Sequence, residues 1–237
     1  DSDSDSDDGF QNPFDPFADP DPTQVFPFRF EVADGESGTS RNSERRRTII
    51  DLRIHGYKTS SDEVWQSTGL TLWKASKYLC DYMVSHAVEL ENNRVLELGA
   101  GLGLNGLLAH RLGARSVVIT DGDSDAMVAL RKNIAVNQRQ RPPHNNDNND
   151  HDNEEEEDGP TRCWDVSAAQ LLWGRDHSER FLEKIANGLK FDTIIASDIV
   201  YSPLVIDPLW ETVRVLLLRR SAAATGAATG AATGAAT

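Results

Sequence analysis

The sequence is poor in cysteine, with only Cys80 and Cys163 among its 237 residues. Two thiols are too few for a disulfide framework or a cysteine zinc site, so we expect an intracellular, reducing compartment, cytoplasmic or nuclear. No apolar run approaches the roughly 18 residues of a membrane span, so no membrane association is expected. The chain begins at Asp1 rather than at a methionine, and a removed targeting peptide stays an open alternative.

Lysine and arginine are absent from two acidic segments, residues 1–22 and 144–159, each of which holds eight Asp and Glu residues. These segments account for the net charge of −14, because they leave 22 acidic residues against the 24 Lys and Arg of the whole chain. Their composition is typical of disorder, so we predict that neither segment folds. The overall acidity predicts no nucleic-acid partner.

Composition divides the chain into a domain and three segments of low complexity. Residues 1–22 are an acidic tail, and residues 23–219 form the predicted domain. Residues 138–160 interrupt this domain as an acidic, low-complexity insertion. Residues 220–237 are an Ala/Thr/Gly tail that offers no large apolar side chain to a core.

Hydrophobic periodicity within the domain predicts an opening pair of strands and then alternating strands and helices. Strands are expected over 24–33, 48–58, 94–98, 116–120, from Arg162 to about Gln170, and over 191–196. Helices are expected from Gly69, over 104–112, from a cap at Ser124 or Asp125, near 178–187, and over 209–218. The first helix is expected to turn one face inward with Leu72, Ala75, Ser76, Leu79, Tyr82 and Met83.

This order is typical of an α/β fold: a doubly wound, Rossmann-like parallel sheet, here preceded by an N-terminal β-hairpin. Such a sheet normally continues beyond four strands. The chain is therefore expected to be a fragment, truncated after the fourth strand and the helix that follows it.

The string ELGAGLG, from Glu97 to Gly103, follows a predicted strand and opens a helix. Gly99 and Gly101 provide a tight turn that lets a ligand approach the backbone closely. A dinucleotide fingerprint needs another glycine where Leu104 stands, which disfavours a nicotinamide oxidoreductase.

Two carboxylates narrow the choice of ligand. Glu97, at the end of the strand, would repel a pyrophosphate but suits a ligand that carries an ammonium group. Asp121 ends the next strand, 22 residues after Gly99, where it is placed to accept hydrogen bonds from a ribose diol. An adenosine ligand with a positively charged amino-acid end fits both, which indicates S-adenosylmethionine.

Five strings of residues together are far more specific than the glycine turn alone. They are TGLTLWKAS at 68–76, VLELGAGLGLNGLLA at 95–109, ITDGD at 119–123, LLWG at 171–174 and ASDIVY at 196–201. They resemble the seven-β-strand, S-adenosylmethionine-dependent methyltransferases, and within these the family-16 protein lysine methyltransferases. The resemblance runs from about Thr68 to Pro203, apart from the insertion.

The resemblance implies a role for each matching residue. The residues bordering the methionine end of the cofactor would be Glu97, Gly99, Ala100 and Gly101. Asp121 would hold the ribose, and the remaining borders of the cofactor pocket would be Trp73, Trp173 and Ser197. Asp198 and Tyr201 would face the incoming methyl acceptor as catalytic residues.

Several of these residues can also be interpreted as serving the fold rather than the function. Trp73 and Trp173 also suit a hydrophobic core, Asp198 also suits a cap for the following segment, and Tyr201 also suits simple surface packing. Ligands of doubly wound sheets bind at the carboxyl ends of the strands, where these residues are expected to gather, and this favours the functional assignment.

The implied activity is S-adenosylmethionine-dependent methyl transfer to a lysine side chain of a protein substrate, by a monomer. Asp198 would position the amine as a hydrogen-bond acceptor, and Tyr201 would offer a hydroxyl or a cation–π face. No metal is predicted, although His144 and His151 lie near carboxylates in the insertion. The alternatives are methylation of a small molecule or another side chain, and a truncated, non-catalytic cofactor-binding module.

Overall fold

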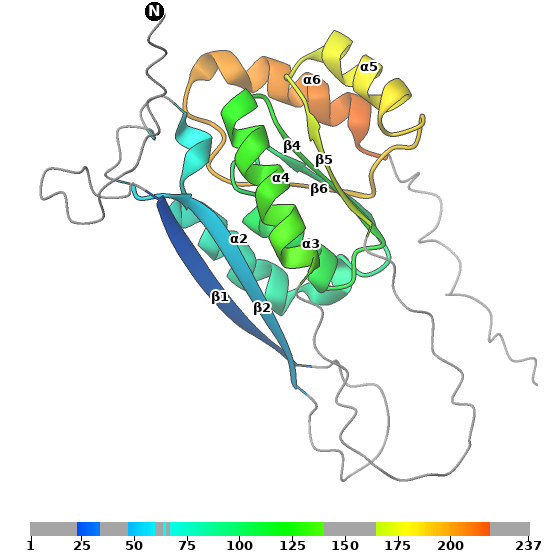
Figure 1. Ribbon diagram of the computed structural model, residues 1–237. Coiled ribbons are helices and arrows are strands. Elements are labelled where there is room, and N and C mark those ends of the chain that lie inside the picture. The colour runs from blue at the N-terminus through cyan, green and yellow to red at the C-terminus, as the bar shows by residue number, and fades with distance from the viewer. Residues whose placement is uncertain (1–22, 34–46, 60–63, 65–66, 140–164, 219–237) are drawn as a thin grey trace, which may run out of the picture.

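The computed structural model describes residues 23–33, 47–59, 64, 67–139 and 165–218. These residues form a four-stranded parallel sheet with helices on both faces and a separate antiparallel hairpin (Figure 1). The strands are β1 Thr23–Ala33, β2 Arg47–Tyr57, β3 Arg94–Leu98, β4 Ser116–Asp121, β5 Val166–Gln170 and β6 Thr193–Ala196. The helices are α2 Lys74–Ser85, α3 Leu104–Arg111, α4 Ser124–Gln138, α5 Arg175–Lys184 and α6 Ile206–Leu216, with short 3₁₀ turns η1 Thr68–Leu70, η2 Ala87–Glu89 and η3 Pro203–Val205. The predicted α/β class and the N-terminal hairpin are confirmed.

The order of strands in the parallel sheet is β5-β4-β3-β6. The chain moves outward from β3 to β4 and β5, through α3 and α4, and then returns to the other side of β3 to form β6. The strand order therefore reverses beside β3. In doubly wound sheets, ligands bind in the crevice at the carboxyl ends of the strands at such a reversal.

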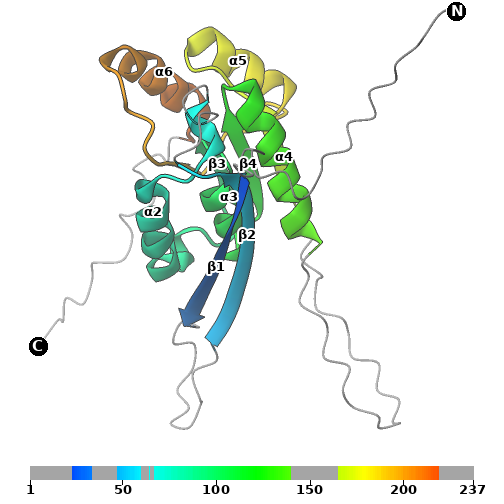
Figure 2. The same ribbon diagram turned by 60° about the vertical axis from the view of Figure 1, so that its left-hand side comes forward.

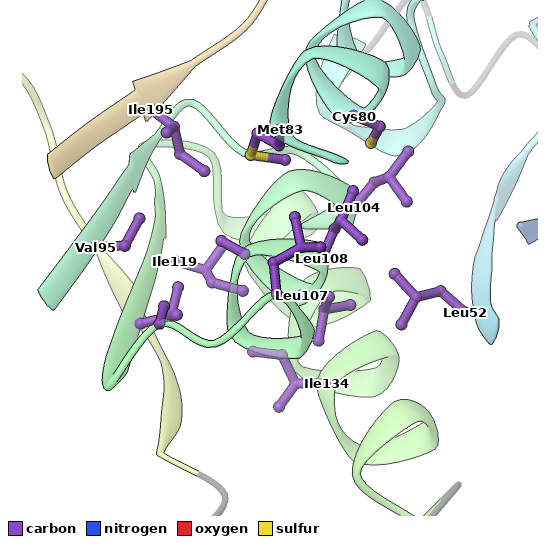
Figure 3. Packing of buried hydrophobic residues seen from close by; sticks show 14 of the residues in the cluster. Leu52, Cys80, Met83, Val95, Leu104, Leu107, Leu108, Ile119, Ile134 and Ile195 are labelled. Carbon is purple, nitrogen blue, oxygen red and sulfur yellow. The ribbon is translucent and has the colours of Figure 1, made fainter. Parts of the chain in front are cut away.

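Both faces of the sheet are buried, and side chains along each strand alternate between two hydrophobic clusters. Val95 and Ile119 belong to the first cluster, which α2, α3, α4 and β2 cover (Figure 3). Leu96 and Val118 belong to the second cluster, which α5 and α6 cover. Because both faces are covered, consecutive apolar residues fill the middle of β3, at 95–96, and of β4, at 117–119, without polar alternation.

The hairpin packs its inner face on the first cluster, where Ile50, Leu52 and Ile54 of β2 are buried. β1 lies against α2, whereas β2 lies against α3 and α4 (Figure 2). The hairpin forms no strand pairing with the parallel sheet. The edge of β2 that faces away from β1 therefore needs other hydrogen-bond partners.

Two asparagines of α4 supply these partners. Asn133 accepts from the His55 amide at 2.8 Å and donates to the His55 carbonyl at 3.0 Å. One turn later, Asn137 accepts from the Arg53 amide at 3.0 Å and donates to the Arg53 carbonyl at 2.8 Å. Asn133 also donates to the carbonyl of Leu102, at 3.1 Å. The side-chain amides thus replace a neighbouring strand and tie the hairpin to the loop that follows β3.

Three local expectations were wrong. The first long helix begins at Lys74 rather than near Gly69, and a 3₁₀ turn precedes it. Tyr82 is exposed and stacks on the His86 ring, with ring centroids 4.0 Å apart, instead of facing the core. The cap of α4 is Asp123, whose carboxylate accepts from the amides of Asp125 and Ala126, rather than either residue that follows it.

After α6 the chain continues beside the sheet. Leu217 forms a parallel bridge with Phe191, and the Leu218 amide donates to the Phe191 carbonyl at 2.8 Å. The segment after the helix therefore lies on the outer side of the chain that leads into β6, where a further parallel strand would pair. The predicted truncation after this helix stays a prediction.

The low-complexity segments lie largely outside the described residues. The predicted acidic tail 1–22 and the predicted C-terminal tail 220–237 are not among the described residues. Helix α4 extends to Gln138, the first residue assigned to the insertion, and residues 140–164 lie outside the description together with Cys163.

Candidate active site

A cavity of about 510 Å³ opens at the carboxyl end of the parallel sheet. All four strands contribute the residues that follow them, and the segment before α2 closes the remaining side. The walls come from residues 67–69, 71–73, 76, 99–101, 121–123, 171–173, 197–199 and 201. Its volume lies within the range of about 300–1,000 Å³ that is typical of small-molecule sites.

The glycine turn after β3 brings backbone directly to the cavity. Gly99 and Gly101 have φ values of 60° and 53°, in the left-handed region that favours glycine. A Cβ on Gly101 would lie 2.8 Å from the carbonyl oxygen of Gly69, and a Cβ on Gly99 would lie 2.6 Å from the side chain of Ile199. The turn therefore packs against both opposing walls only because neither position has a side chain.

Asp121 is half-buried, and its carboxylate already holds the turn. One oxygen accepts from the amide of Gly101 at 2.8 Å, and the other accepts from the amide of Asp123 at 2.9 Å. Each carboxylate oxygen has a second acceptor position, so both oxygens can take a further hydrogen bond from a ligand. Asp123 extends the arrangement by accepting from the hydroxyl of Ser67 at 2.9 Å.

The two tryptophans lie on different sides of the cavity. The indole of Trp73 donates to the carbonyl of Thr68 at 2.9 Å, which fixes the ring beside the closing segment, and 40% of this residue is exposed. Trp173 is half-buried and packs against the second hydrophobic cluster, within van der Waals distance of a Cβ placed on Gly99. Each ring contributes an apolar wall to the cavity.

Glu97 is the one candidate residue that does not line the cavity. Strand alternation places it on the same face as Val95, beneath α3, where it is only 1% exposed. The amide of Gly106 donates to its carboxyl group at 2.8 Å. Glu97 therefore connects β3 to α3 below the glycine turn.

Burial raises the pKa of Glu97 to about 8, and the charge of Asp121 acts in the same direction, while hydrogen bonds from Gly106 and Asn105 act against it. The ordinary pKa is 4.5, so between pH 4.5 and about 8 the folded state binds a proton that the unfolded state has lost. Glu97 therefore contributes most to the free energy of unfolding below pH 4.5. Its contribution decreases as the pH rises toward 8, by up to about 1.4 kcal/mol per pH unit.

We expect Glu97→Gln, which keeps the acceptor for Gly106, to remove this contribution to the pH dependence. The free energy of unfolding, measured by denaturant titration from pH 5 to pH 8, should favour the glutamine variant progressively as the pH rises. A constant difference between the two proteins across this range would show that Glu97 titrates normally.

The segment after β6 forms the most open wall. Asp198 is exposed and adopts a φ of 58°, which is uncommon for a residue with a side chain. Tyr201 is 78% exposed. Ser197 is half-buried, and its hydroxyl accepts from the side-chain amide of Asn105 at 3.1 Å.

The structure thus brings nine of the ten candidate residues to one cavity. Sequence reasoning missed the wall made by Ser67 and Gly69, and it missed Asn105 behind Ser197. Assigning the cap of α4 to Asp123 would have pointed to Ser67, because the Asp123 carboxylate accepts a hydrogen bond from the Ser67 hydroxyl. No local pattern distinguishes Asn105 from a solvent-facing helical residue.

The described residues contain neither a metal-binding cluster nor a membrane-spanning helix. There, no group of three or more His, Cys, Asp or Glu side chains is arranged to hold a metal ion. No described helix combines the length and the apolar character needed to cross a bilayer. His144 and His151 lie outside the described residues.

Curated proteins similar to this chain include two methyltransferases. Protein N-terminal and lysine N-methyltransferase EFM7 of Yarrowia lipolytica is 34% identical over 172 residues, which cover 70% of this chain and 56% of the relative. Protein N-lysine methyltransferase METTL21A of Xenopus tropicalis is 33% identical over 168 residues, which cover 70% of this chain and 64% of the relative. The match therefore spans less than two thirds of either relative.

Among solved structures, the 16S rRNA N2 G1207 methyltransferase RsmC of T. thermophilus, in complex with AdoMet and guanosine, superposes with a TM-score of 0.47. The identity is 16%, over 84% of this chain and 40% of that chain. A family model described as lysine methyltransferase matches residues 58–226, well over half of the sequence. The chain belongs to the lysine methyltransferase family.

Proposed function

We propose that this chain binds S-adenosylmethionine and catalyses methyl transfer to the lysine side chain of a protein substrate. One observation carries the proposal: a single cavity holds the glycine turn and Asp121 on one side and Asp198 and Tyr201 on another. On this proposal, the nucleoside and the amine would bind within one small volume. The names of the curated relatives support the same reaction.

The described residues fit this cofactor. Between Gly69 and Gly101 the backbones approach so closely that any Cβ would fill the space, so the turn offers peptide groups rather than side chains to the ligand. Asp121 retains acceptor capacity for the two hydroxyls of a ribose. Trp73 and Trp173 would border the cofactor with apolar ring surface.

When bound, the cofactor supplies a methyl group on a positively charged sulfur. An acceptor lysine is mostly protonated near neutral pH, since its reference pKa is about 10.4, and would lose a proton to water before its nitrogen can attack the methyl carbon. Asp198 would accept a hydrogen bond from the amine and direct its lone pair toward the methyl group. Tyr201 would contact the amine through its hydroxyl or its ring face. Most of the acceleration would come from this alignment.

The roles of the two aspartates predict different kinetic effects. Asp121→Asn should weaken cofactor binding by about 10- to 100-fold, because one charge-assisted hydrogen bond to the ribose is lost. Asp198→Asn should leave the affinity within about threefold of the parent and lower methyl transfer by at least about 100-fold. Calorimetric titration with S-adenosylmethionine and transfer of a tritiated methyl group measure the two effects.

Asp176→Asn is the matched control, because this exposed carboxylate lies on α5 and outside the cavity walls. It should change neither quantity. Equal losses of affinity in the Asp121 and Asp198 variants would contradict the division of roles.

The acceptor group is tested with protein extracts that differ only in their amines. Conversion of lysine to homoarginine blocks lysine side chains and leaves N-terminal amines free, whereas acetylation blocks both. Transfer to the untreated extract alone supports lysine methylation. Transfer that survives homoarginine conversion but not acetylation assigns the reaction to N-terminal amines instead.

A cofactor-binding module without catalysis is the second candidate, and the exposure of the acceptor wall favours it. In this wall Asp198 is exposed and Tyr201 is 78% exposed, whereas the residues of the glycine turn are half-buried or buried. Binding of S-adenosylmethionine without transfer to any extract would support this candidate.

We place the proposed activity inside the cell, in the cytoplasm or nucleus, and assign it to a monomer without a nucleic-acid partner. The small number of cysteines and the acidic composition support this assignment. Cys80 is buried, and burial raises the pKa of its thiol, so this cysteine is a structural group rather than a reactive one.

A further inference from the structure

Asn105 occupies an unusual position for a polar side chain. It lies in the first turn of α3, is 2% exposed, and belongs to the part of the core between α2, α3 and the parallel sheet. Asparagine is a poor helix former, and a buried amide is costly unless it is hydrogen-bonded. Its partners therefore indicate what its presence achieves.

Those partners come from three separate elements. The Cys80 thiol, on α2, donates to the Asn105 side-chain oxygen at 3.2 Å. The Asn105 side-chain nitrogen donates to the hydroxyl of Ser197, directly after β6, at 3.1 Å. The same side chain also interacts with the carboxyl group of Glu97 on β3 and lowers its pKa. One side-chain amide on α3 thus connects α2 to the segment that follows β6, which forms the most open wall of the cavity.

The residue after Ser197 is the strained one. Asp198 has a φ of 58°, and a residue with a side chain keeps this conformation only where its surroundings fix it. Asp198 itself is exposed to solvent. The hydrogen bond from Asn105 to Ser197 lies one residue before this strained position.

We infer that Asn105 is a positioning residue, whose side-chain amide anchors Ser197 and thereby holds Asp198 in its left-handed conformation, facing the methyl acceptor. The role of Asp198 toward the acceptor rests on the proposed function. The anchoring of the turn does not, because it concerns only hydrogen bonds within the chain.

Cys80 fixes which way the amide points. Burial raises the pKa of this thiol, and the negative charges of Glu97 and Asp81 raise it further, so the sulfur stays protonated and acts as a donor. A donor at this place binds the oxygen of the Asn105 amide and leaves the nitrogen directed at Ser197. The orientation of Asn105 thus depends on a neighbour that never reaches the cavity.

Amide hydrogen exchange of the purified chain tests the inference without any substrate. Asn105→Leu is similar in size and removes both hydrogen bonds, to Cys80 and to Ser197. We expect at least a 10-fold faster exchange over residues 197–201, with exchange across β4 unchanged. Affinity for S-adenosylmethionine should stay within threefold, while transfer to the untreated protein extract falls at least 10-fold.

Thr212→Val is the matched control. Thr212 is equally buried, but it bonds to Gly174, Ser178 and Pro208 rather than to the turn after β6. Its loss should not accelerate exchange over 197–201 selectively. An unchanged rate over 197–201 in the Asn105 variant, or a uniform increase across all strands, would overturn the inference.

Cys80 offers a milder test if the leucine variant fails to fold. Cys80→Ser keeps a donor and should exchange like the parent protein over 197–201, whereas Cys80→Ala should exchange severalfold faster. Identical rates in the two variants would reject the anchoring role. A parent protein without methyl transfer would refute the proposed function, while the exchange rates would still decide the role of Asn105.

Discussion

Replacing Gly101 with alanine should reduce the affinity for S-adenosylmethionine by at least about 100-fold. The new Cβ would lie 2.8 Å from the backbone oxygen of Gly69, a distance that requires one of the two chains to move. Both residues line the cavity, so the movement changes the surface that would meet the cofactor. The same movement disturbs the amide of Gly101, which donates to Asp121. Calorimetric titration measures the affinity directly.

Gly188→Ala separates this steric effect from backbone strain. Gly188 has a φ of 72°, close to the 53° of Gly101, but nothing lies within 4 Å of the position of its Cβ. Both alanine variants should lose about 1 kcal/mol of stability to the left-handed conformation. Only the Gly101 variant should lose affinity. Comparable affinities in the two variants would show that the close approach of Gly69 has no role in binding.

The second large effect concerns stability. Asn133→Ala should lower the free energy of unfolding by about 2–4 kcal/mol, because it leaves the amide and the carbonyl of His55 and the carbonyl of Leu102 without their partner. Asn137→Ala should lower the free energy of unfolding by a similar amount, since it leaves the amide and the carbonyl of Arg53 without their partner. Urea titration of each variant gives these values.

Lys132→Ala provides the reference for α4, because Lys132 is exposed and adjacent in sequence. It should change the free energy of unfolding by less than about 0.5 kcal/mol. Asn133→Ala should also weaken cofactor binding more than Asn137→Ala does, since only Asn133 reaches the loop after β3. Asparagine variants as stable as the Lys132 variant would mean that water replaces these side chains without loss.

The elements of the fold could be predicted because their signals are local. Apolar runs such as 94–98 and 116–121 bounded by turn residues indicate buried strands, and their alternation with helices indicates a parallel sheet. The cap of α4 could not be assigned in this way. Asp121, Asp123, Ser124 and Asp125 lie within five residues, and all of these types cap helices, so only the backbone conformation decides among them.

The orientation of Glu97 could not be predicted for a different reason. Both faces of β3 are covered, so its flanking residues are apolar on both sides and give no indication of which face a polar residue joins. The role of the two asparagines of α4 could not be predicted either. On a helix they suggest solvent exposure, and their true partners lie 78 and 84 residues away along the chain. Tertiary contacts alone determine these features.

The end of α4 and the start of β5 both lie at the edge of the sheet opposite the cavity. Helix α4 runs from Ser124, beside the cavity, back to Gln138, and β5 begins with the pairing of Val166 and Val117, at the amino ends of the strands. The free energy of closing a loop grows only with the logarithm of its length, so a longer connection here costs the fold little. In evolutionary terms, this connection can gain, lose or exchange residues without readjustment of the residues that line the cavity, and a trait acquired there can be selected independently of the cavity.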